Sequence, residues 1–248
     1  QFTPTPTREP RTDLPPALVE VRPFPSSVIG LNESITLYFN QAMDYSAVEA
    51  AFHFEPRISG RFEWEDSRTV TFYPDQKLEA GSHLTLAIDT TAQAANQKNL
   101  SDPVELNFQV ADHLQTIQVM PVNGTQDVDP ESVIFVAFNQ PVVHLGEESS
   151  AEPGFSLSPE VPGKGTWLNT STYVFTPEPG MSGGTTYTIA LNRNLTATSG
   201  ATMSSNQAFE YHFSTKQPEI EKVLPMPGEL LSLDGPVEIL FNMRMNTQ

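Results

Sequence analysis

The sequence has no cysteine among its 248 residues. This absence excludes disulfides, zinc–thiolate sites, a cysteine nucleophile and a thioester from this stretch of chain. It indicates no compartment, because many exported bacterial proteins lack cysteine too. No apolar run approaches the roughly 20 residues that cross a membrane as a helix. No signal peptide is present either, so for an exported protein we expect the targeting segment to have been removed before Gln1.

Basic side chains are scarce as well. The chain has 13 Lys and Arg against 30 Asp and Glu, which is a formal net charge of -17. Because binding to phosphate needs a basic surface, this balance excludes nucleic acid and anionic membrane as partners. We expect a soluble acidic surface, with membrane attachment only through an N-terminal lipid anchor outside this chain. The expected partners are other proteins or neighbouring domains of the same chain.

What the chain does contain is one pattern that occurs twice in full and then begins a third time. A short motif ending in proline is followed by an alternating apolar segment that ends in Phe-Asn. The three occurrences are Val21-Arg22-Pro23 with 35–41, Val119-Met120-Pro121 with 134–140, and Val223-Leu224-Pro225 with 237–242. Tandem arrays of small modules usually act as spacers or as binding surfaces.

The repeat predicts four segments. Residues 1–16, rich in Thr and Pro, form a disordered tether. Residues 17–112 and 113–216 are the two complete copies, called module one and module two below. Residues 217–248 supply the first strands of a third copy. Since two strands cannot bury their own apolar face, we expect this third copy to be completed by sequence beyond Gln248, and otherwise to be frayed or docked on module two.

The two complete copies are equivalent position by position over much of their length. Six residues of the first copy recur in the second at a constant displacement of 103 positions: Pro56, Gly60, Trp64, Phe72, Pro74 and Gly81 match Pro159, Gly163, Trp167, Phe175, Pro177 and Gly184. We assign these residues structural roles. The tryptophans are core anchors, the prolines end strands, and the glycines permit tight turns.

Alternation of apolar and polar residues predicts short strands throughout. In module one the alternating segments are 35–39, 84–88 and 106–108, and residues 61–64 and 69–73 form a hairpin across a polar turn. Seven or so short strands per module predict an all-β fold of tandem immunoglobulin-like antiparallel β-sandwiches. One segment differs: residues 44–51 predict a short helical turn capped by Asp44 or Ser46.

One motif suggests catalysis. Gly180-Met181-Ser182-Gly183-Gly184 matches the G-x-S-x-G nucleophile elbow of hydrolases, which needs a strand before it and a helix after it. In module one the equivalent loop carries Leu78-Glu79-Ala80 with no helix after it. We therefore interpret Ser182 as part of a turn and predict no catalytic residue.

Metal binding has little support. The five histidines are scattered without zinc spacing: His53, His83, His113, His144 and His212. Asp127 and Asp129 are expected in the loop before the second strand of module two, near the junction between modules, where a calcium ion would rigidify an array. Module one has Gly30-Leu31-Asn32 at that place, so we favour a solvated loop and predict neither a metal nor a cofactor.

A repeated asparagine follows the strand in all three copies, at Asn40, Asn139 and Asn242. An asparagine at a strand end usually hydrogen-bonds its own backbone and starts the turn, which we prefer to a binding role. Five N-x-S/T sequons occur as well, at Asn32, Asn99, Asn123, Asn169 and Asn194. In a eukaryotic secreted protein they would imply dense glycosylation, whereas in a bacterial chain rich in Asn, Ser and Thr they would be mostly coincidental.

Taken together, these motifs resemble the bacterial Ig-like domain first associated with surface-layer proteins. Module one shows the whole pattern: Pro23, 35–41, Met43-Asp44, Pro56, Gly60, Trp64, 72–74, Leu78 and Gly81. Module two departs from it at Pro141-Val142-Val143, and an acidic insertion follows at 146–153. The resemblance implies that the array is structural.

A narrower resemblance involves the Thr-Pro tail, the segment LPPALVEVRP and residues 165–175. These look like the N-terminal region of large bacterial alpha-2-macroglobulin-like proteins, in which Ig-like modules precede the macroglobulin domains on an exported, often lipid-anchored chain. The resemblance implies trapping of foreign proteases by the parent protein. The family's reactive Cys-x-x-Gln and its bait region would lie outside this chain, so no functional residue can be transferred.

Three functions therefore remain open. The first is a non-enzymatic structural or interaction segment of an exported cell-surface protein of the macroglobulin type. The second is a surface-layer, adhesin or polysaccharide-associated array of the same modules. The third is an accessory region of an enzyme whose catalytic part lies elsewhere. We expect no active site within these residues.

Overall fold

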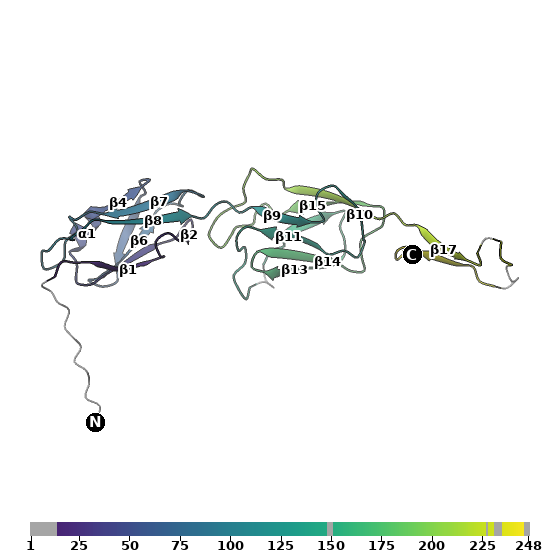
Figure 1. The fold of residues 1–248 in the computed structure, drawn as a ribbon, viewed down its shortest axis with the longest axis horizontal. Coiled ribbons are helices and arrows are strands. Elements are labelled where there is room, and N and C mark those ends of the chain that lie inside the picture. The colour runs from purple at the N-terminus through teal and green to yellow at the C-terminus, as the bar shows by residue number, and fades with distance from the viewer. Residues whose placement is uncertain (1–13, 148–150, 227, 231–234, 246–248) are drawn as a thin grey trace, which may run out of the picture. The chain divides into compact units, whose positions relative to one another are not determined.

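The computed structural model describes residues 14–147, 151–226, 228–230 and 235–245. The chain divides into two compact units, one of residues 1–113 with 199–201 and the other of the remaining residues. The first unit contains module one. The second contains module two and the described part of the third copy. Apart from one short helix, the regular structure in the described ranges consists of strands (Figure 1).

Module one is a sandwich of two four-stranded sheets. One sheet has the order β1-β3-β6-β5 and the other β2-β8-β7-β4. Neighbours pair antiparallel except β2 and β8, which are parallel. The elements are β1 (Leu18–Arg22), β2 (Val28–Ile29), β3 (Ile35–Phe39), α1 (Tyr45–Ala51), β4 (Phe52–Glu55), β5 (Gly60–Trp64), β6 (Thr69–Pro74), β7 (His83–Ile88) and β8 (Val104–Val110).

Module two repeats this topology strand for strand. Its sheets have the orders β13-β14-β11-β9 and β10-β16-β15-β12, and the parallel pair is β10 with β16. The strands are β9 (Thr116–Met120), β10 (Thr125–Val128), β11 (Ile134–Phe138), β12 (Phe155–Ser158), β13 (Gly163–Asn169), β14 (Thr172–Pro177), β15 (Thr186–Leu191) and β16 (Glu210–Thr215). The predicted all-β fold of tandem sandwiches is therefore confirmed, with eight strands in each module.

The alternating segments bury one face and expose the other. In β3 and β11 the first, third and fifth residues are buried and the two between them are half-buried. The predicted hairpin of module one is the antiparallel pair β5–β6, with Trp64 opposite Val70. Because the inner faces of both sheets contribute to one apolar layer, the core of each module lies between its two sheets.

The two tryptophans are held in the same way by unlike segments. The indole N–H of Trp64 donates to Glu49 Oε1 at 2.9 Å, and that of Trp167 donates to the backbone oxygen of Glu152 at 3.0 Å. Each acceptor precedes its tryptophan by 15 residues and lies between the third and fourth strands of its module. Tyr45 also stacks on Trp64, with ring centroids 4.3 Å apart. Both connections thus satisfy the indole donor. Trp167 is buried as a core anchor, as predicted, whereas Trp64 is only half-buried.

The helix α1 begins where the sequence predicts. The Asp44 Oδ1 atom accepts from the Ala47 backbone N–H at 3.0 Å and from the Ser46 hydroxyl at 2.8 Å. The backbone hydrogen bond from Ala47 and the hydroxyl of Ser46 both lower the pKa of Asp44, because they stabilise its carboxylate. Asp44 is therefore the N-cap, and Ser46 supports it.

The repeated glycines have two different roles. Gly81 and Gly184 have φ of 74° and 61°, so they occupy the turn conformation that was predicted for them. Gly60 and Gly163 do not lie in turns, because each is the first residue of a strand. A Cβ at either position would meet the ring of the diagonal phenylalanine and a backbone oxygen of the neighbouring strand. The turn prediction was wrong for this pair, whose glycines allow close packing instead.

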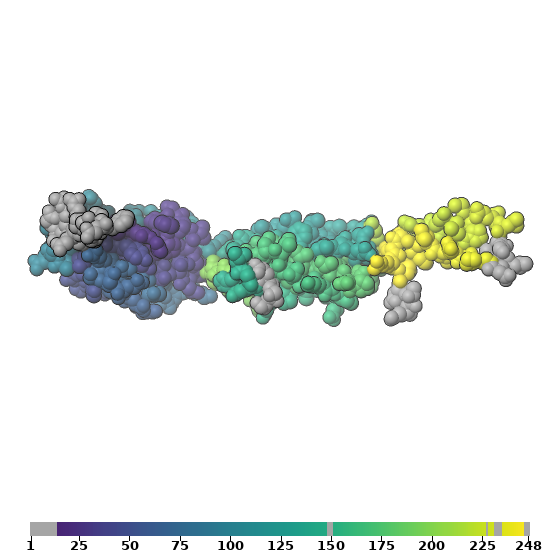
Figure 2. Space-filling model, turned by 90° about the horizontal axis from the view of Figure 1, so that it is seen from below, coloured from purple at the N-terminus to yellow at the C-terminus, as the bar shows by residue number. Residues whose placement is uncertain are grey.

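The third copy forms a hairpin of β17 (Ile220–Leu224) and β18 (Glu238–Phe241). Its register matches the first two copies, since Val223 pairs with Ile239 as Val21 pairs with Leu37. Figure 2 shows this segment in yellow as much thinner than either sandwich. Val237 and Ile239 are 56% and 49% exposed, although their equivalents in modules one and two are buried.

Part of the predicted tether and the predicted end of the chain fall outside the described residues. Of residues 1–16 only Leu14, Pro15 and Pro16 are described. The Leu14 backbone oxygen accepts from Gln41 Nε2 at 2.9 Å, and Pro16 is buried, so this short stretch packs on module one. Within the described ranges no helix is long and apolar enough to cross a membrane.

The close packing at Gly163 can be tested by replacing it with alanine. We expect Gly163→Ala to lower the unfolding free energy of module two by about 1–3 kcal/mol, because the added methyl group must displace β14 or the Phe175 ring. Urea unfolding followed by Trp167 fluorescence in a Trp64→Phe background measures the change. The control is Lys164→Ala at the exposed neighbour, for which we expect less than about 0.5 kcal/mol. Equal effects of the two variants would contradict the packing role.

Candidate functional site

The motif around Ser182 lies in the turn between β14 and β15, as predicted. The Ser182 backbone N–H donates to the Tyr187 hydroxyl at 2.9 Å, and its backbone oxygen accepts from the Thr215 hydroxyl at 2.6 Å. The next regular element is the strand β15, and not the helix that a nucleophile elbow requires. The turn therefore lacks the geometry of a hydrolase site.

Histidines and carboxylates do not assemble into a metal-binding cluster in the described part of the chain, where no group of three or more potential ligands occurs. His53 Nε2 lies 2.7 Å from Asp89 Oδ2 at the surface, and His212 Nδ1 lies 2.9 Å from the Thr188 hydroxyl. Each contact joins neighbouring parts of the same module.

Asp127 and Asp129 have different surroundings. Asp127 belongs to β10, so its placement in a loop was wrong, and it has a φ of 55°. Asp129 follows that strand, and its Oδ1 atom accepts from the Glu131 backbone N–H at 3.0 Å. Its Oδ2 atom lies 3.6 Å from Lys216 Nζ. Asp129 therefore takes part in a turn and an ion pair, which is a role that the sequence did not predict.

The repeated asparagines join distant parts of their copies. Asn40 donates its backbone N–H to the Ala17 oxygen at 3.0 Å, and its Oδ1 atom accepts from the Ala17 N–H at 2.9 Å. Asn139 makes the same two bonds with Gln115, at 2.9 and 2.8 Å. Asn242 makes them with Glu219, each at 3.0 Å. We call this pair of bonds the asparagine clamp.

The clamp corrects the sequence interpretation. Starting a local turn would involve the asparagine's own neighbours, whereas the clamp reaches back over 23 or 24 residues to the point where the copy begins. It closes the pairing of the first and third strands and fixes the entry of the chain into each copy. No local signal marks this role, but its recurrence in all three copies could have suggested it.

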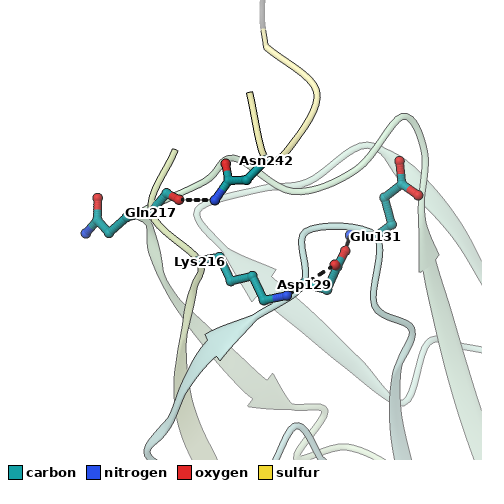
Figure 3. Close-up of polar contacts among 5 residues, drawn as sticks. All are labelled: Asp129, Glu131, Lys216, Gln217 and Asn242. Atoms are coloured by element: carbon teal, nitrogen blue, oxygen red, sulfur yellow. Dashed lines mark hydrogen bonds and ion pairs between the residues drawn. The ribbon is translucent and has the colours of Figure 1, made fainter. Parts of the chain in front are cut away.

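A shallow groove adjoins the clamp of the third copy, within the second compact unit. It is lined by two loops of module two and by the start and end of the hairpin: residues 129–131, 179–183, Pro218 and 242–245. Figure 3 shows Lys216 directed towards Asp129, and Asn242 donating from Nδ2 to the Gln217 oxygen at 3.0 Å. Arg244 Nε lies 3.5 Å from Glu131 Oε1. Of these three contacts, the Arg244–Glu131 pair is the one that joins the third copy to module two.

The outer sheet faces of the two modules differ in chemistry. On module one, Arg22 and Arg61 lie over the rings of Tyr38 and Tyr73, and Glu20 and Glu63 pair with these arginines. The matching face of module two is apolar around Phe135, which lies between Met120 and Val174. It is polar at Gln118 and Lys164, the positions equivalent to Glu20 and Arg61. Val133 before β11 and Leu168 of β13 are exposed. Exposed apolar faces of this kind are typical of surfaces that contact other proteins.

Two β-sandwiches follow one another in the chain, and an asparagine clamp fixes the start of each. This arrangement is that of modular Ig-like proteins. The model of the bacterial Ig-like domain family matches residues 12–110 and 111–215. The chain therefore belongs to the bacterial Ig-like domain family, with two tandem copies. Domains of this family are non-catalytic. Comparison with curated proteins gave no match.

Three solved structures are similar to this chain over part of its length. An L,D-transpeptidase from Mycobacterium smegmatis is 16% identical over 61% of this chain and 59% of its own, with a TM-score of 0.33. The N-terminal part of the bacterial S-layer protein SbsC is 14% identical over 83% of this chain and 45% of its own, with a TM-score of 0.33. Native alpha-2-macroglobulin from Escherichia coli, spanning domains MG0-NIE-MG1, is 11% identical over 84% and 74%, also with a TM-score of 0.33. The chain thus spans less than two thirds of the first two.

The clamp can be tested at Asn40. We expect Asn40→Ala to lower the unfolding free energy of module one by about 0.5–1 kcal/mol, because the Ala17 N–H loses its acceptor. Asn40→Asp retains an oxygen at that place and should stay near the parent value. Urea unfolding followed by Trp64 fluorescence in a Trp167→Phe background measures both. If alanine and aspartate were equally destabilising, the side-chain bond would not be the cause.

Proposed function

We propose that this chain is a non-catalytic structural and interaction segment of an exported cell-surface protein. The observation that carries the proposal is the asparagine clamp, which closes the entry of every copy in the same way. A repeat whose copies all begin from the same fixed contact is suited to holding other parts of a protein at set positions. Membership of the bacterial Ig-like family supports the same role.

For the parent protein we propose an alpha-2-macroglobulin-like protease inhibitor, with this chain as its N-terminal Ig-like region. The support is the sequence resemblance in LPPALVEVRP and in residues 165–175. The alternative is a surface-layer, adhesin or polysaccharide-associated array, which the module type alone supports equally well. In either protein the chemistry would belong to other domains.

We propose proteins, including neighbouring domains of the same chain, as the partners. The net charge of -17 disfavours nucleic acid and anionic lipid. The apolar face around Phe135 supports contact with protein, since contacts of that kind bury apolar side chains. Attachment to a membrane would need a lipid anchor outside these residues.

Export can be tested on intact cells of the native host. We expect proteinase K, added outside the cells, to remove the segment that an antibody against modules one and two detects. A cytoplasmic protein probed in the same samples should stay intact. A segment that becomes sensitive only after lysis would contradict the cell-surface proposal.

Purified proteases can test whether protease trapping resides in this chain or in other domains of the parent protein. We expect residues 1–248 alone to form no complex with trypsin, chymotrypsin or thermolysin in size-exclusion chromatography, because we assign protease trapping to other domains of the parent. The full-length parent should co-elute with active protease. Complex formation by the isolated chain would contradict a purely structural role, and a parent that traps no protease would favour the surface-layer or adhesin alternative.

A further inference from the structure

Two ion pairs at the groove at the end of module two involve basic residues, which are scarce in this chain. Only 13 of its residues are Lys or Arg, yet two of them, Lys216 and Arg244, lie here with a carboxylate each, at 3.6 and 3.5 Å. Lys216 is also fixed by its backbone, since its oxygen accepts from the Gly184 N–H at 2.7 Å and its N–H donates to Val128 at 2.9 Å. Lys216 is thus positioned by module two, and Arg244 belongs to the third copy.

The acidic partners are specific to module two. The loop Asp129-Pro130-Glu131 follows β10, and module one has Gly30-Leu31-Asn32 after the equivalent β2. Neither carboxylate therefore has a counterpart in module one. The two loops are otherwise built alike, because Met181 N–H donates to the Pro130 oxygen at 2.8 Å and Leu78 N–H donates to the Leu31 oxygen at 2.8 Å. The two loops therefore differ in charge but share the same backbone hydrogen bond.

The residues of the third copy that line the groove differ from their equivalents in the first two copies. Arg244 stands two positions after the clamp asparagine, where the first two copies have Ala42 and Pro141. Met243 stands one position after it, where both of the others have glutamine. Only the third copy therefore carries a cation that can reach Glu131, and only there is the preceding side chain apolar.

The absence of a side chain at Gly183 leaves room for Met243 of the third copy. A Cβ on Gly183 would collide with the sulfur of Met243 and would lie 3.1 Å from the Lys216 backbone oxygen. Module one has Ala80 at the position of Gly183. The missing side chain in module two makes room for the methionine, whose flexible thioether fills irregular gaps well.

From these matched differences we propose that loop 129–131 and Gly183 form a docking surface that holds the hairpin of the third copy in one orientation on module two. Glu131 provides the charge opposite Arg244, and Gly183 provides the space for Met243. Asp129 pairs with Lys216 within module two, at the edge of the same surface. Charge pairs at a contact edge contribute more to specificity than to affinity, so the surface sets the orientation in which the hairpin is held. This inference rests on the proposed structural role and deepens it.

The test measures how narrowly the hairpin is held. Spin labels at Thr166→Cys and Glu221→Cys, both exposed positions in the second unit, report one distance distribution by pulsed electron resonance, and the absence of native cysteine makes the labelling specific. We expect a narrow distribution for the parent chain and a broader one for Glu131→Lys, with the undocked fraction rising about two- to fivefold. Glu131→Lys combined with Arg244→Glu should restore the narrow distribution.

Control variants separate the proposed pairing from general charge. Glu160→Lys makes the same change in net charge at an exposed site outside the groove and should leave the distribution narrow. Replacing Met243 and Arg244 by the second copy's glutamine and proline, as Met243→Gln with Arg244→Pro, should broaden it, and so should Gly183→Val. Thermal unfolding followed by Trp167 fluorescence shows that module two remains folded in each variant.

Two outcomes would overturn the docking surface. One is an unchanged distribution in Glu131→Lys, and the other is a failure of the charge-swapped double variant to narrow it again. Broadening by Glu160→Lys to the same extent would assign the effect to net charge and overturn it as well. None of these results bears on the structural role itself, because exposure of the segment on intact cells does not depend on Arg244.

Discussion

The antiparallel pairing of the first and third strands, closed by the asparagine clamp, is the contact on which each copy depends. It sets the register that places Leu37, Val136 and Ile239 at equivalent positions. A shift by one residue would turn every apolar side chain of the strand to the other face. The clamp opposes such a shift because its two hydrogen bonds join the residue before the first strand to the residue after the third, at one end of the pairing. The remaining strands can then add to an edge whose alignment is already fixed.

Around this common start the two modules reach the same core by different routes. Trp64 is covered by a short helix whose tyrosine stacks on it, and Trp167 is covered by a longer connection that offers a backbone oxygen. The indole N–H must find an acceptor in either case. The acidic insertion that distinguishes module two from the family pattern therefore contributes to its core at Glu152.

Much of this fold could be predicted from the sequence because the repeat and the alternation are local patterns. The hairpin β5–β6 and the helix capped by Asp44 follow from residues close to one another in the chain. The turn at Ser182 follows from the equivalent loop of module one, which the repeat identifies. The clamp and the roles of Gly60 and Gly163 could not be predicted in the same way. They depend on contacts between strands that are distant in sequence, and a glycine needed for space looks the same as a glycine needed for a turn. The pairing of Asp129 with Lys216 spans an even longer separation.

The motif that resembles a hydrolase elbow shows how packing can produce a catalytic pattern by coincidence. Gly180 has a φ of 136° and Gly184 a φ of 61°, so both occupy conformations that favour glycine. Gly184 also has an equivalent in Gly81, which adopts the same turn in a module without the motif. Gly183 leaves room for Met243. Each glycine thus has its own structural cause, and Ser182 lies between them in a turn held through its backbone. The feature that most suggested chemistry is better explained as part of the surface on which the third copy docks.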